Sequence, residues 1–355
     1  MTDQSEPLKR HPQADGERRY DAVVVGGGAA GLSGALTLSR ARRSVLVIDE
    51  GRPRNAPAAG VHAYLAREGV APSRLLADGR AEVTGYGGEI VTDRVVAAER
   101  LEAGRGFRVV RRDGPAVLAD RLLVTTGLAD ELPDVPGVAE RWGRDVLHCP
   151  YCHGWEVRDQ PVGVLGTGPL AVHQALLWRQ WTADVTLFLH TAPEPAEDEY
   201  EQLAARDIAV VDGEVASLEV TGDRLTGVTL AGGRVVPRRA LAVAPRFTAR
   251  AGILTGLGLG TTEQETGGHV VGSYVAADPT GATEVPGVWV AGNVSGLTEQ
   301  VIGAAAAGAR AAGAINADLV AEDTRRAVAA RRAPFSAPME RELSERTSGS
   351  RRHGL

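Results

Sequence analysis

The sequence predicts an α/β protein of two three-layer domains, the second inserted into the first, on two observations. A strand, a glycine-rich turn, a helix and a second strand come one after another near the N-terminus, and the same order recurs about 140 residues later. Short apolar strands that end in glycine turns come after the second unit, which indicates that the first domain resumes. This order is typical of Rossmann-like nucleotide-binding domains.

Length and composition fit two folded domains. The chain has 355 residues, and 44 of them, about 12%, are glycine, against an average of about 7%. We therefore expect glycine at specific backbone positions. The formal net charge of −6 argues against nucleic acid as the main partner. Two cysteines are too few for the dense disulfide framework of a small secreted domain.

The sequence shows neither a targeting signal nor a membrane span. Residues 1–19 are polar and charged, without the apolar run of a signal peptide. The most apolar late stretch, 301–320, is mostly alanine and contains Arg310 and Asp318. A cytoplasmic protein that does not enter a membrane is therefore expected.

The first unit begins at Tyr20. A continuous apolar run over 22–25 predicts a strand buried on both faces, 32–41 has a helical pattern, and 45–48 predicts the next strand. Together these segments make a βαβ unit, and Asp49 stands at the end of its second strand.

Three glycines in the first turn, Gly26, Gly28 and Gly31, fit the G-x-G-x-x-G pattern. Gly26 permits a tight turn, Gly28 leaves room for a pyrophosphate against the backbone, and Gly31 lets helix and strand pack closely. The helix N-terminus attracts the phosphate charge, and Asp49 can accept both hydroxyls of an adenosine ribose. Because strand, helix, second strand and acid occur together, this unit is predicted to bind a dinucleotide.

The second unit repeats the order of strand, turn, helix and strand. We expect its first strand over 162–165, its helix over 172–179 and its second strand over 185–189. The turn contains Gly166, Gly168 and Ala171 in a G-x-G-x-x-A pattern. The last strand ends in His-Thr-Ala-Pro, residues 190–193, with neither an acid for a ribose hydroxyl nor an arginine for a 2′-phosphate. A Rossmann fold is predicted here, but whether a nicotinamide cofactor is used stays open.

The two cysteines stand together in His148-Cys149-Pro150-Tyr151-Cys152-His153, between the two units. A zinc site is one interpretation, but structural zinc sites combine two separated ligand pairs, and the chain has no further cysteine, so no metal site is expected. A redox dithiol is favoured, because C-x-x-C brings two sulfurs within bridging distance. His153 could move the proton or pack locally, whereas a packing role is favoured for His148.

The later chain returns to the first domain. Strands over 122–126 and 288–291 lead into Gly127 and Gly292, and an alanine-rich helix is expected from about Gln300 to Val320. The segment 325–355 holds eight arginines and three glutamates, a net charge of +5. We expect five parts: a disordered N-terminus (1–19), the first domain (20–132), the inserted domain with the dithiol (133–248), the rest of the first domain (249–324) and a disordered basic tail (325–355).

In the order of these parts the chain resembles the low-molecular-weight thioredoxin reductases, a family of flavoproteins. The resemblance covers about Tyr20 to Val320, most of the chain. It rests on the two glycine motifs, the C-x-x-C motif and three further segments, Thr125-Thr126-Gly127, Leu132-Pro133-Asp134-Val135-Pro136-Gly137 and Val290-Ala291-Gly292-Asn293.

The resemblance implies that the first unit binds FAD and that the inserted domain carries a nicotinamide site and the dithiol. Cys152 would face the flavin, and Cys149 would exchange with the substrate. The residues implied at FAD are Gly26, Gly28, Ala30, Gly31, Asp49, Thr126, Gly127, Gly292, Asn293 and Gln300. Those implied at the nicotinamide site are Gly166, Gly168 and Ala171. A homodimer is also implied.

Three departures from the family pattern are informative. His153 and Asn293 each stand where the family usually has Asp, and one residue is missing between Asn293 and Gln300. Thr191 and Ala192 replace the paired arginines that recognise the 2′-phosphate of NADPH. In these departures the chain is similar to a branch of the family that closes disulfides in small natural products of the holomycin and gliotoxin type.

The leading hypothesis is therefore an FAD-dependent thiol–disulfide oxidoreductase that oxidises a small-molecule dithiol, with O₂ as acceptor. The same fold also suits an NAD(P)H-dependent reductase of thioredoxin or a similar protein. A third hypothesis is a redox-sensing flavoprotein without turnover, in which the two cysteines act as a switch. The expected partner is a small dithiol or disulfide, or a thioredoxin-like protein.

Overall fold

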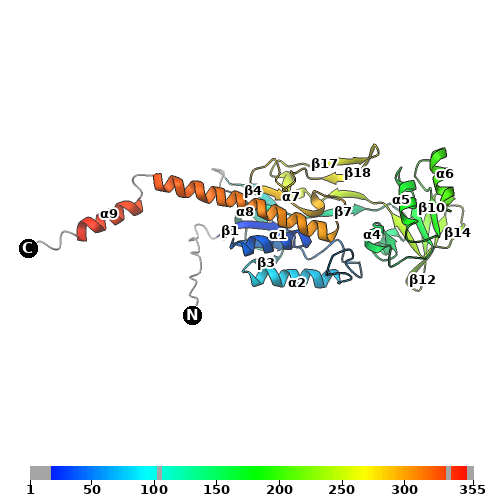
Figure 1. The fold of residues 1–355 in the computed structure, drawn as a ribbon, viewed down its shortest axis with the longest axis horizontal. Helices are drawn as coiled ribbons and strands as arrows, with labels where there is room; N and C mark the ends of the chain where they lie inside the picture. The colour runs from blue at the N-terminus through cyan, green and yellow to red at the C-terminus, as the bar shows by residue number, and fades with distance from the viewer. Residues whose placement is uncertain (1–16, 102–105, 333–336, 350–355) are drawn as a thin grey trace, which may run out of the picture.

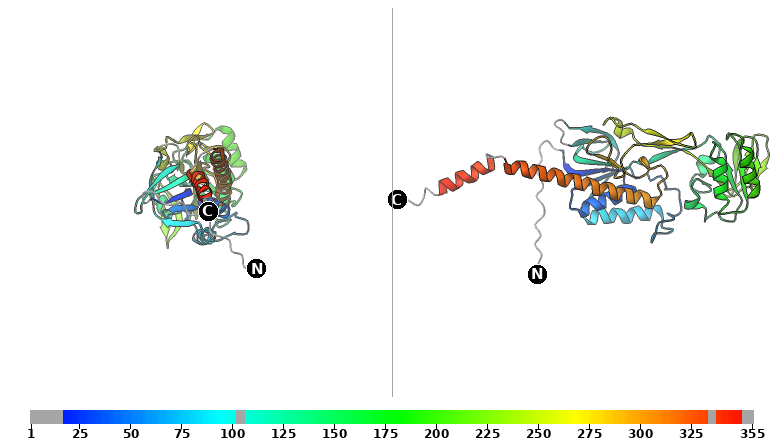
Figure 2. Two further views of the ribbon diagram at one scale, coloured as in Figure 1. Left: turned by 90° about the vertical axis from the view of Figure 1, so that its left-hand side faces the viewer. Right: turned by 45° about the horizontal axis from the view of Figure 1, so that its top comes forward.

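Two α/β units lie side by side along the long axis of the molecule. The computed structural model describes residues 17–101, 106–332 and 337–349. In Figure 1 the first unit lies in the middle, the second unit lies at the right-hand end, and the last helices reach away to the left. The right-hand view in Figure 2 shows the same arrangement.

The first unit is built on a mostly parallel sheet. Its strands are β1 (Arg19–Val25), β2 (Val45–Asp49), β3 (Glu89–Thr92), β4 (Val95–Arg100), β5 (Phe107–Arg111), β6 (Val117–Val124) and β19 (Val288–Val290). The order is β3-β2-β1-β6-β5-β4, and β19 pairs with the last part of β6. Strand β5 runs antiparallel to both of its neighbours, β4 and β6. Along β1, Ala22 and Val24 face one core cluster and Val23 and Val25 face another, so the strand is buried on both faces.

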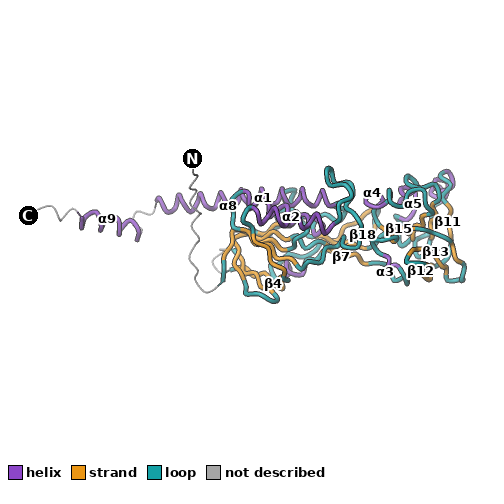
Figure 3. The backbone as a smooth tube through the Cα atoms, turned by 90° about the horizontal axis from the view of Figure 1, so that it is seen from below, coloured by secondary structure: helices purple, strands orange, loops and turns teal. Residues whose placement is uncertain are grey.

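Helices cover one face of this sheet, as Figure 3 shows. They are α1 (Ala29–Arg40), α2 (Pro72–Gly85) and α8 (Val301–Arg332). The other face packs against α7 (Gly252–Thr255) and the chain that returns from the second unit. Helices α1 and α8 cross closely, because a Cβ on Gly308 would lie 1.9 Å from the carbonyl oxygen of Ala30.

The second unit has a parallel sheet in the order β11-β10-β9-β15-β8. Its strands are β8 (Val146–Leu147), β9 (Val162–Leu165), β10 (Val185–Phe188), β11 (Ala209–Val211) and β15 (Ala240–Val243). One face packs on α5 (Ala171–Trp178) and α6 (Glu197–Ala205). The other packs on α3 (Val138–Arg141) and on an antiparallel sheet of β12 (Val215–Thr221), β13 (Arg224–Leu230) and β14 (Val235–Val236).

A small sheet joins the two units. It contains β7 (Leu128–Glu131), β16 (Arg246–Ala249), β17 (Thr262–Thr266) and β18 (His269–Tyr274), in the order β17-β18-β16-β7. The chain leaves the first unit through β7 and returns through β16, which pairs with β7 in antiparallel register. The second unit is therefore an insertion held by two adjacent strands.

The C-terminal segment differs from the expected disordered tail over 325–355. Helix α8 continues to Arg332 instead of ending near Val320, and α9 (Ala337–Gly349) comes after it. Alanine, arginine and glutamate favour helix here, and Glu322 and Arg326 form an ion pair one turn apart. The rest of this tail and residues 1–16 of the expected disordered N-terminus lie outside the described residues, whereas Arg19 already belongs to β1.

None of the helices is suited to a lipid bilayer. In the part of the chain that the structure describes, no helix combines the length and the apolar composition that crossing a membrane requires.

Candidate active site

The first glycine turn shows why its glycines are required. Gly26 has φ +103°, and a Cβ there would lie 2.6 Å from the carbonyl oxygen of Thr125. A Cβ at Gly31 would lie 1.9 Å from the carbonyl oxygen of Gly26, so only glycine lets α1 approach β1 this closely. Thr125 fixes the turn, because its Oγ1 donates to the carbonyl oxygens of Val25 and Gly26 at 3.0 and 2.9 Å.

Gly28, at the N-terminus of α1, lies against open space. An added Cβ would meet nothing within 4 Å. No side chain caps this helix, so the N–H groups of its first turn are available to an anion. An open backbone beside an uncapped helix N-terminus fits a pyrophosphate, in agreement with the prediction of a dinucleotide site.

Asp49 ends β2 beside this turn. Its Oδ1 accepts a hydrogen bond from the N–H of Gly27 at 2.9 Å, and its Oδ2 accepts one from Arg80 of α2 at 2.6 Å. Each carboxylate oxygen has a further lone pair for a ribose hydroxyl. Arg80 therefore orients the acid that the sequence pattern indicates. Arg80 could not be predicted from the sequence, because no local pattern links residues 31 positions apart.

The residues expected along the flavin lie in the turns after β6 and β19. Thr126 Oγ1 donates to the carbonyl oxygen of Arg250 at 2.7 Å, which ties the first turn to the returning chain. Gly127 and Gly292 have φ +70° and +74°. A Cβ on Gly292 would lie 2.9 Å from the Cβ of Ala30, so this turn packs directly against the first helix.

The second glycine turn has the same backbone plan. A Cβ at Gly166 would lie 2.7 Å from the carbonyl oxygen of Leu189, whereas one at Gly168 would meet nothing within 4 Å. Ala171 is the first residue of α5. Gly166 thus serves close packing, and Gly168 leaves its backbone open.

The residues after β10 fold back onto this second turn. The N–H groups of Thr191 and Ala192 both donate to the carbonyl oxygen of Gly166 at 3.1 Å. His190 has φ +47°, and its Nδ1 accepts the N–H of Val215 at 3.1 Å. Burial lowers the pKa of His190, so its imidazole is neutral at pH 7 and does not replace an arginine at a 2′-phosphate.

The dithiol lies around α4 (Pro150–His153), which Cys149 precedes. The two Sγ atoms are 2.8 Å apart, and the Cys152 thiol donates to Cys149. This hydrogen bond, with others from Gln300 and the N–H groups of Tyr151 and Cys152, lowers the pKa of Cys149 to about 7 against the effect of burial. The same bond, together with burial, raises the pKa of Cys152. The first proton of the reduced pair therefore leaves near pH 7, and it leaves Cys149, while Cys152 keeps its proton.

Two histidines flank the pair. His148 Nδ1 donates to the carbonyl oxygen of Val243 at 3.1 Å, which leaves Nε2 as an acceptor, and its ring meets Phe247 edge-on with centroids 5.1 Å apart. Burial lowers the pKa of both His148 and His153. Both are neutral at pH 7 and able to accept a proton.

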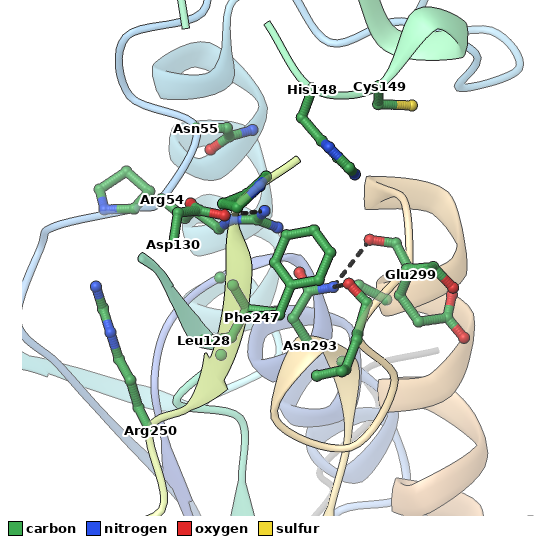
Figure 4. A pocket seen from close by; sticks show the side chains of 18 of the residues that line it. Arg54, Asn55, Leu128, Asp130, His148, Cys149, Phe247, Arg250, Asn293 and Glu299 are labelled. Atoms are coloured by element: carbon green, nitrogen blue, oxygen red, sulfur yellow. Dashed lines mark hydrogen bonds and ion pairs between the residues drawn. The ribbon is translucent and has the colours of Figure 1, made fainter. Parts of the chain in front are cut away.

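A cavity of about 1940 Å³ connects the two units, and Figure 4 shows part of its wall. His148 and Cys149 lie on one side of it, and Asn293 and Glu299 lie on the other. The packing role favoured for His148 from the sequence is therefore incomplete. Most of the predicted site residues line the cavity: Gly26, Gly28, Ala30, Asp49, Thr126, Gly127, Cys149, Cys152, His153, Gly168, Ala171, Gly292, Asn293 and Gln300. Gly31 and Gly166 are not in its wall, and both serve packing.

Arg54, on the loop after β2, links the cavity wall to the connecting strands. It forms a bidentate pair with Asp130 of β7 at 2.8 and 2.6 Å, and its guanidinium lies 5.3 Å from the ring centroid of Phe247 on β16. Its positive charge acts to lower the pKa of Cys152 and of His148. No sequence pattern indicates Arg54, since its contacts join a loop to two distant strands.

Asn293, a residue expected along the flavin, lines the cavity and also bonds to its own turn. Its Nδ2 lies 3.0, 3.3 and 3.0 Å from the carbonyl oxygens of Gly296, Leu297 and Glu299, which share its two N–H groups. The side-chain amide therefore holds the turn that leads into Gln300 and α8.

The fold and this site define the class of protein. The sequence profile of the pyridine nucleotide-disulphide oxidoreductase family matches residues 20–313. The chain belongs to this family, and it is a flavin-dependent disulfide oxidoreductase similar to thioredoxin reductases, with FAD as its cofactor. Among the described residues, no three His, Cys, Asp or Glu side chains are grouped so as to hold a metal ion.

Individual relatives agree with this class. The chain is similar to the crystal structure of HlmI, with a TM-score of 0.81 and 48% identity over 89% of this chain and 97% of the other. Thioredoxin reductase sirT of Leptosphaeria maculans is 29% identical over 86% of this chain and 95% of the relative. The probable thioredoxin reductase of Arthroderma benhamiae is 34% identical over 53% and 48%, so the match spans about half of that relative. Thioredoxin reductase tcpT of Claviceps purpurea is likewise matched over about half its length, 39% identical over 46% of this chain and 52% of the relative.

Proposed function

We propose that the protein is a dithiol oxidase, which closes an intramolecular disulfide in a small-molecule dithiol and uses O₂ as the electron acceptor. The observation that carries the proposal is the position of the dithiol. Cys149 and Cys152 share one cavity with the flavin-side residues Asn293 and Gln300. A small molecule in this cavity meets the dithiol without any movement of the second unit.

The size of the cavity supports two occupants. A site for one small ligand measures roughly 300–1,000 Å³. The volume of about 1940 Å³ here exceeds that range, so it can hold a dinucleotide and a further small molecule. A protein substrate such as thioredoxin would have to reach sulfurs that lie inside this cavity.

The second glycine turn supports independence from NADPH. The chain after β10 bonds to the carbonyl oxygen of Gly166 and carries no arginine for a 2′-phosphate. A dithiol substrate itself delivers the electron pair, so turnover needs no nicotinamide.

The chemistry is a pair of thiol–disulfide exchanges. One substrate thiolate attacks Cys149 Sγ of the oxidised pair, which forms a mixed disulfide and releases Cys152 as a thiolate. The second substrate thiolate attacks the substrate sulfur of that mixed disulfide, which closes the product disulfide and releases the Cys149 thiolate. The substrate loses two electrons and two protons, and the protein pair becomes reduced. Bound FAD supplies the redox chemistry that takes this electron pair to O₂, giving H₂O₂.

His148 and His153 are the groups that move protons in this proposal. Each substrate thiol must lose its proton before it attacks. His148 presents Nε2 as an acceptor, because Nδ1 donates to Val243, and His153 ends the helix that carries Cys152. Both imidazoles are neutral at pH 7, the state that a general base needs.

Oxygen consumption tests the proposal. Purified holoenzyme is mixed with a panel of small dithiols in air, and O₂ uptake, H₂O₂ and loss of free thiols are measured. We expect one product disulfide and one H₂O₂ for each O₂ consumed, and no turnover with Cys149→Ser or Cys152→Ser. Absence of turnover with every small dithiol, in a preparation that reduces thioredoxin with NADPH, would contradict the proposal.

The alternative function is an NAD(P)H-dependent thioredoxin reductase. It is favoured by the names of the relatives and by the open backbone at Gly168, which lines the same cavity. Release of thiols from thioredoxin with NADPH or NADH as reductant would support it. In that case residues other than Thr191 and Ala192 must bind the adenosine end.

A further inference from the structure

We propose that a loop of the first unit braces the second unit, with His62 and Glu156 as positioning residues that keep the dithiol on the flavin side during turnover. This bridging loop is residues 50–71, the segment between β2 and α2. The inference rests on the proposed function and deepens it, because it names what holds the second unit in place while a small dithiol is oxidised.

The attachment of the second unit permits it to turn. The chain enters this unit through β7 and leaves it through β16, and the two strands pair side by side. Two adjacent strands can act as a hinge, because a few residues at their ends absorb the change in backbone angles. A contact outside the hinge is therefore needed to keep the second unit, and with it the dithiol, in one place.

The bridging loop contacts the second unit on both sides of the dithiol in the sequence. Before the dithiol, a Cβ on Gly143 would lie 3.0 Å from the Cβ of Pro57. After it, Glu156 Oε1 lies 3.5 Å from His62 Nε2. Near the start of the loop, Arg54 holds β7 through its bidentate ion pair. The loop thus contacts the second unit at two places and one of its connecting strands at a third.

The His62 side chain is fixed within the loop. Its Nδ1 lies 2.6 Å from Glu68 Oε1, and Glu68 Oε2 accepts the N–H of Ala63 at 2.8 Å. A Cβ on Gly60 would lie 3.0 Å from His62 Nε2, so the ring also packs on the backbone of the loop. The remaining nitrogen, Nε2, is the one that lies near Glu156. The ring is therefore held in the orientation that the contact between the units requires.

The contact is an ion pair when His62 is protonated. Glu68 and Glu156 then each lie near one nitrogen of an imidazolium, which carries a proton on both. His153, at the end of the dithiol helix, is a further titratable group here. Burial lowers the pKa of His153, and the charges of Glu156 and His62 act on it in opposite directions. The brace should be strongest in acidic solution, where imidazoles are protonated.

A covalent lock tests whether the second unit has to move. Pro57→Cys combined with Gly143→Cys places two Cβ atoms close to the separation of roughly 3.5–4.5 Å that a disulfide requires. Oxidation of the folded holoenzyme should bridge the introduced pair, and mass spectrometry before and after turnover detects the bridge. The locked protein should oxidise a small dithiol within about twofold of the rate of the single variants. These carry the same substitutions without the bridge, including the strain of a side chain at Gly143, where φ is +76°.

Access to the sulfurs tests the pair of His62 and Glu156. Reduced holoenzyme reacts anaerobically with a maleimide on a polyethylene glycol chain and, separately, with iodoacetamide. The ratio of the two rates cancels the thiolate fraction and measures access for the bulky reagent. At pH 6, Glu156→Gln and His62→Gln should raise this ratio about twofold to fivefold, the effect of one exposed ion pair. At pH 9 the wild type should match them, because its imidazole is neutral, whereas His62→Arg should keep the low ratio at both pH values.

A control in the same loop separates the brace from the fold of the loop. Asp78→Asn removes the partner of Arg67, 3.6 Å away, and both residues belong to the first unit. This variant should keep the wild-type ratio at pH 6.

Three results would overturn the proposal: no bridge on oxidation of the introduced pair, loss of dithiol oxidation in the locked protein but not in the single variants, or a wild-type ratio in Glu156→Gln at pH 6. The first and third need neither a substrate nor O₂. If bridging and access come out as expected while no variant oxidises a small dithiol, the proposed function fails and the brace stands.

Discussion

The two glycine turns of the molecule share a backbone plan and differ in the ligand groups at the end of the next strand. An added Cβ would meet open space at both Gly28 and Gly168, and each glycine lies just before a helix. In the first unit, Asp49 presents a carboxylate oriented by Arg80. In the second, the chain closes onto Gly166 and offers no charged group to a ribose. The spacing of the glycines thus predicts the backbone conformation of the turn, whereas the residues at the end of the next strand indicate which ligand the turn can bind.

The largest effect is expected from matched substitutions in the two turns. Gly28→Val should fill the pyrophosphate cradle, so the protein should purify without flavin and show no measurable dithiol oxidation. Gly168→Val should leave flavin content and dithiol turnover within about twofold of wild type, because the reaction does not use this turn. Flavin absorbance per protein and O₂ uptake measure both variants. Equal losses in the two would remove the distinction between the turns.

In the second unit, we expect His148 to contribute more to dithiol oxidation than the glycines of the turn. His148→Gln keeps a hydrogen-bonding side chain but cannot be a base, and it should lower kcat/KM for the dithiol about 100-fold, the lower end of general-base effects. Flavin content should stay at the wild-type level. Steady-state oxidation and absorbance spectra measure the two quantities. A kcat/KM within about threefold of wild type would assign proton transfer to His153 or water.

The lowered pKa of His148 also predicts how dithiol oxidation depends on pH. Burial lowers the pKa of His148 below its ordinary value of 6.5, so the imidazole stays neutral down to pH 6.5 and protonates only in more acidic solution. Activity that needs the neutral ring should therefore persist at pH 6.5 and fall below it. His148→Gln should lose this acid limb. A fall that begins above pH 7 in the wild type would contradict a depressed pKa.

A smaller effect is expected at the acid of the first unit. Arg80→Met removes the partner of Asp49 Oδ2 and keeps most of the length of the side chain. The affinity for FAD should fall about tenfold, the equivalent of about 1.4 kcal/mol, because the carboxylate loses its orientation. Flavin titration of the apoprotein measures it. Unchanged affinity would show that the N–H of Gly27 alone orients Asp49.

The smallest effect is expected in the second unit. Thr191→Arg restores one of the two arginines that the family uses, at an exposed position. Because Ala192 packs against Gly166, a single arginine should raise the rate of flavin reduction by NADPH less than about threefold relative to NADH. Stopped-flow mixing with each nucleotide measures the ratio. A tenfold gain would show that the turn still accepts the adenosine end.

The sequence predicted the features that are local along the chain. The glycine pattern located the turns at Gly26 and Gly166 because each turn lies within a single strand-to-helix segment. Arg80, Arg54 and the role of Asn293 could not be predicted, because they depend on contacts between distant segments or on the path of a turn. The helix beyond Val320 has a local signal in its alanine and arginine content, whereas the net charge of +5 over 325–355 favours a disordered tail.

The most direct test of the central claim is anaerobic stopped-flow reduction of the bound flavin. Holoenzyme is mixed with a small dithiol in one experiment and with NADPH in another, and flavin absorbance is followed. We predict rapid loss of absorbance with the dithiol, none with the dithiol in Cys149→Ser, and only slow change with NADPH. Rapid bleaching by NADPH, with no small dithiol able to bleach the flavin, would contradict a dithiol oxidase and identify a reductase.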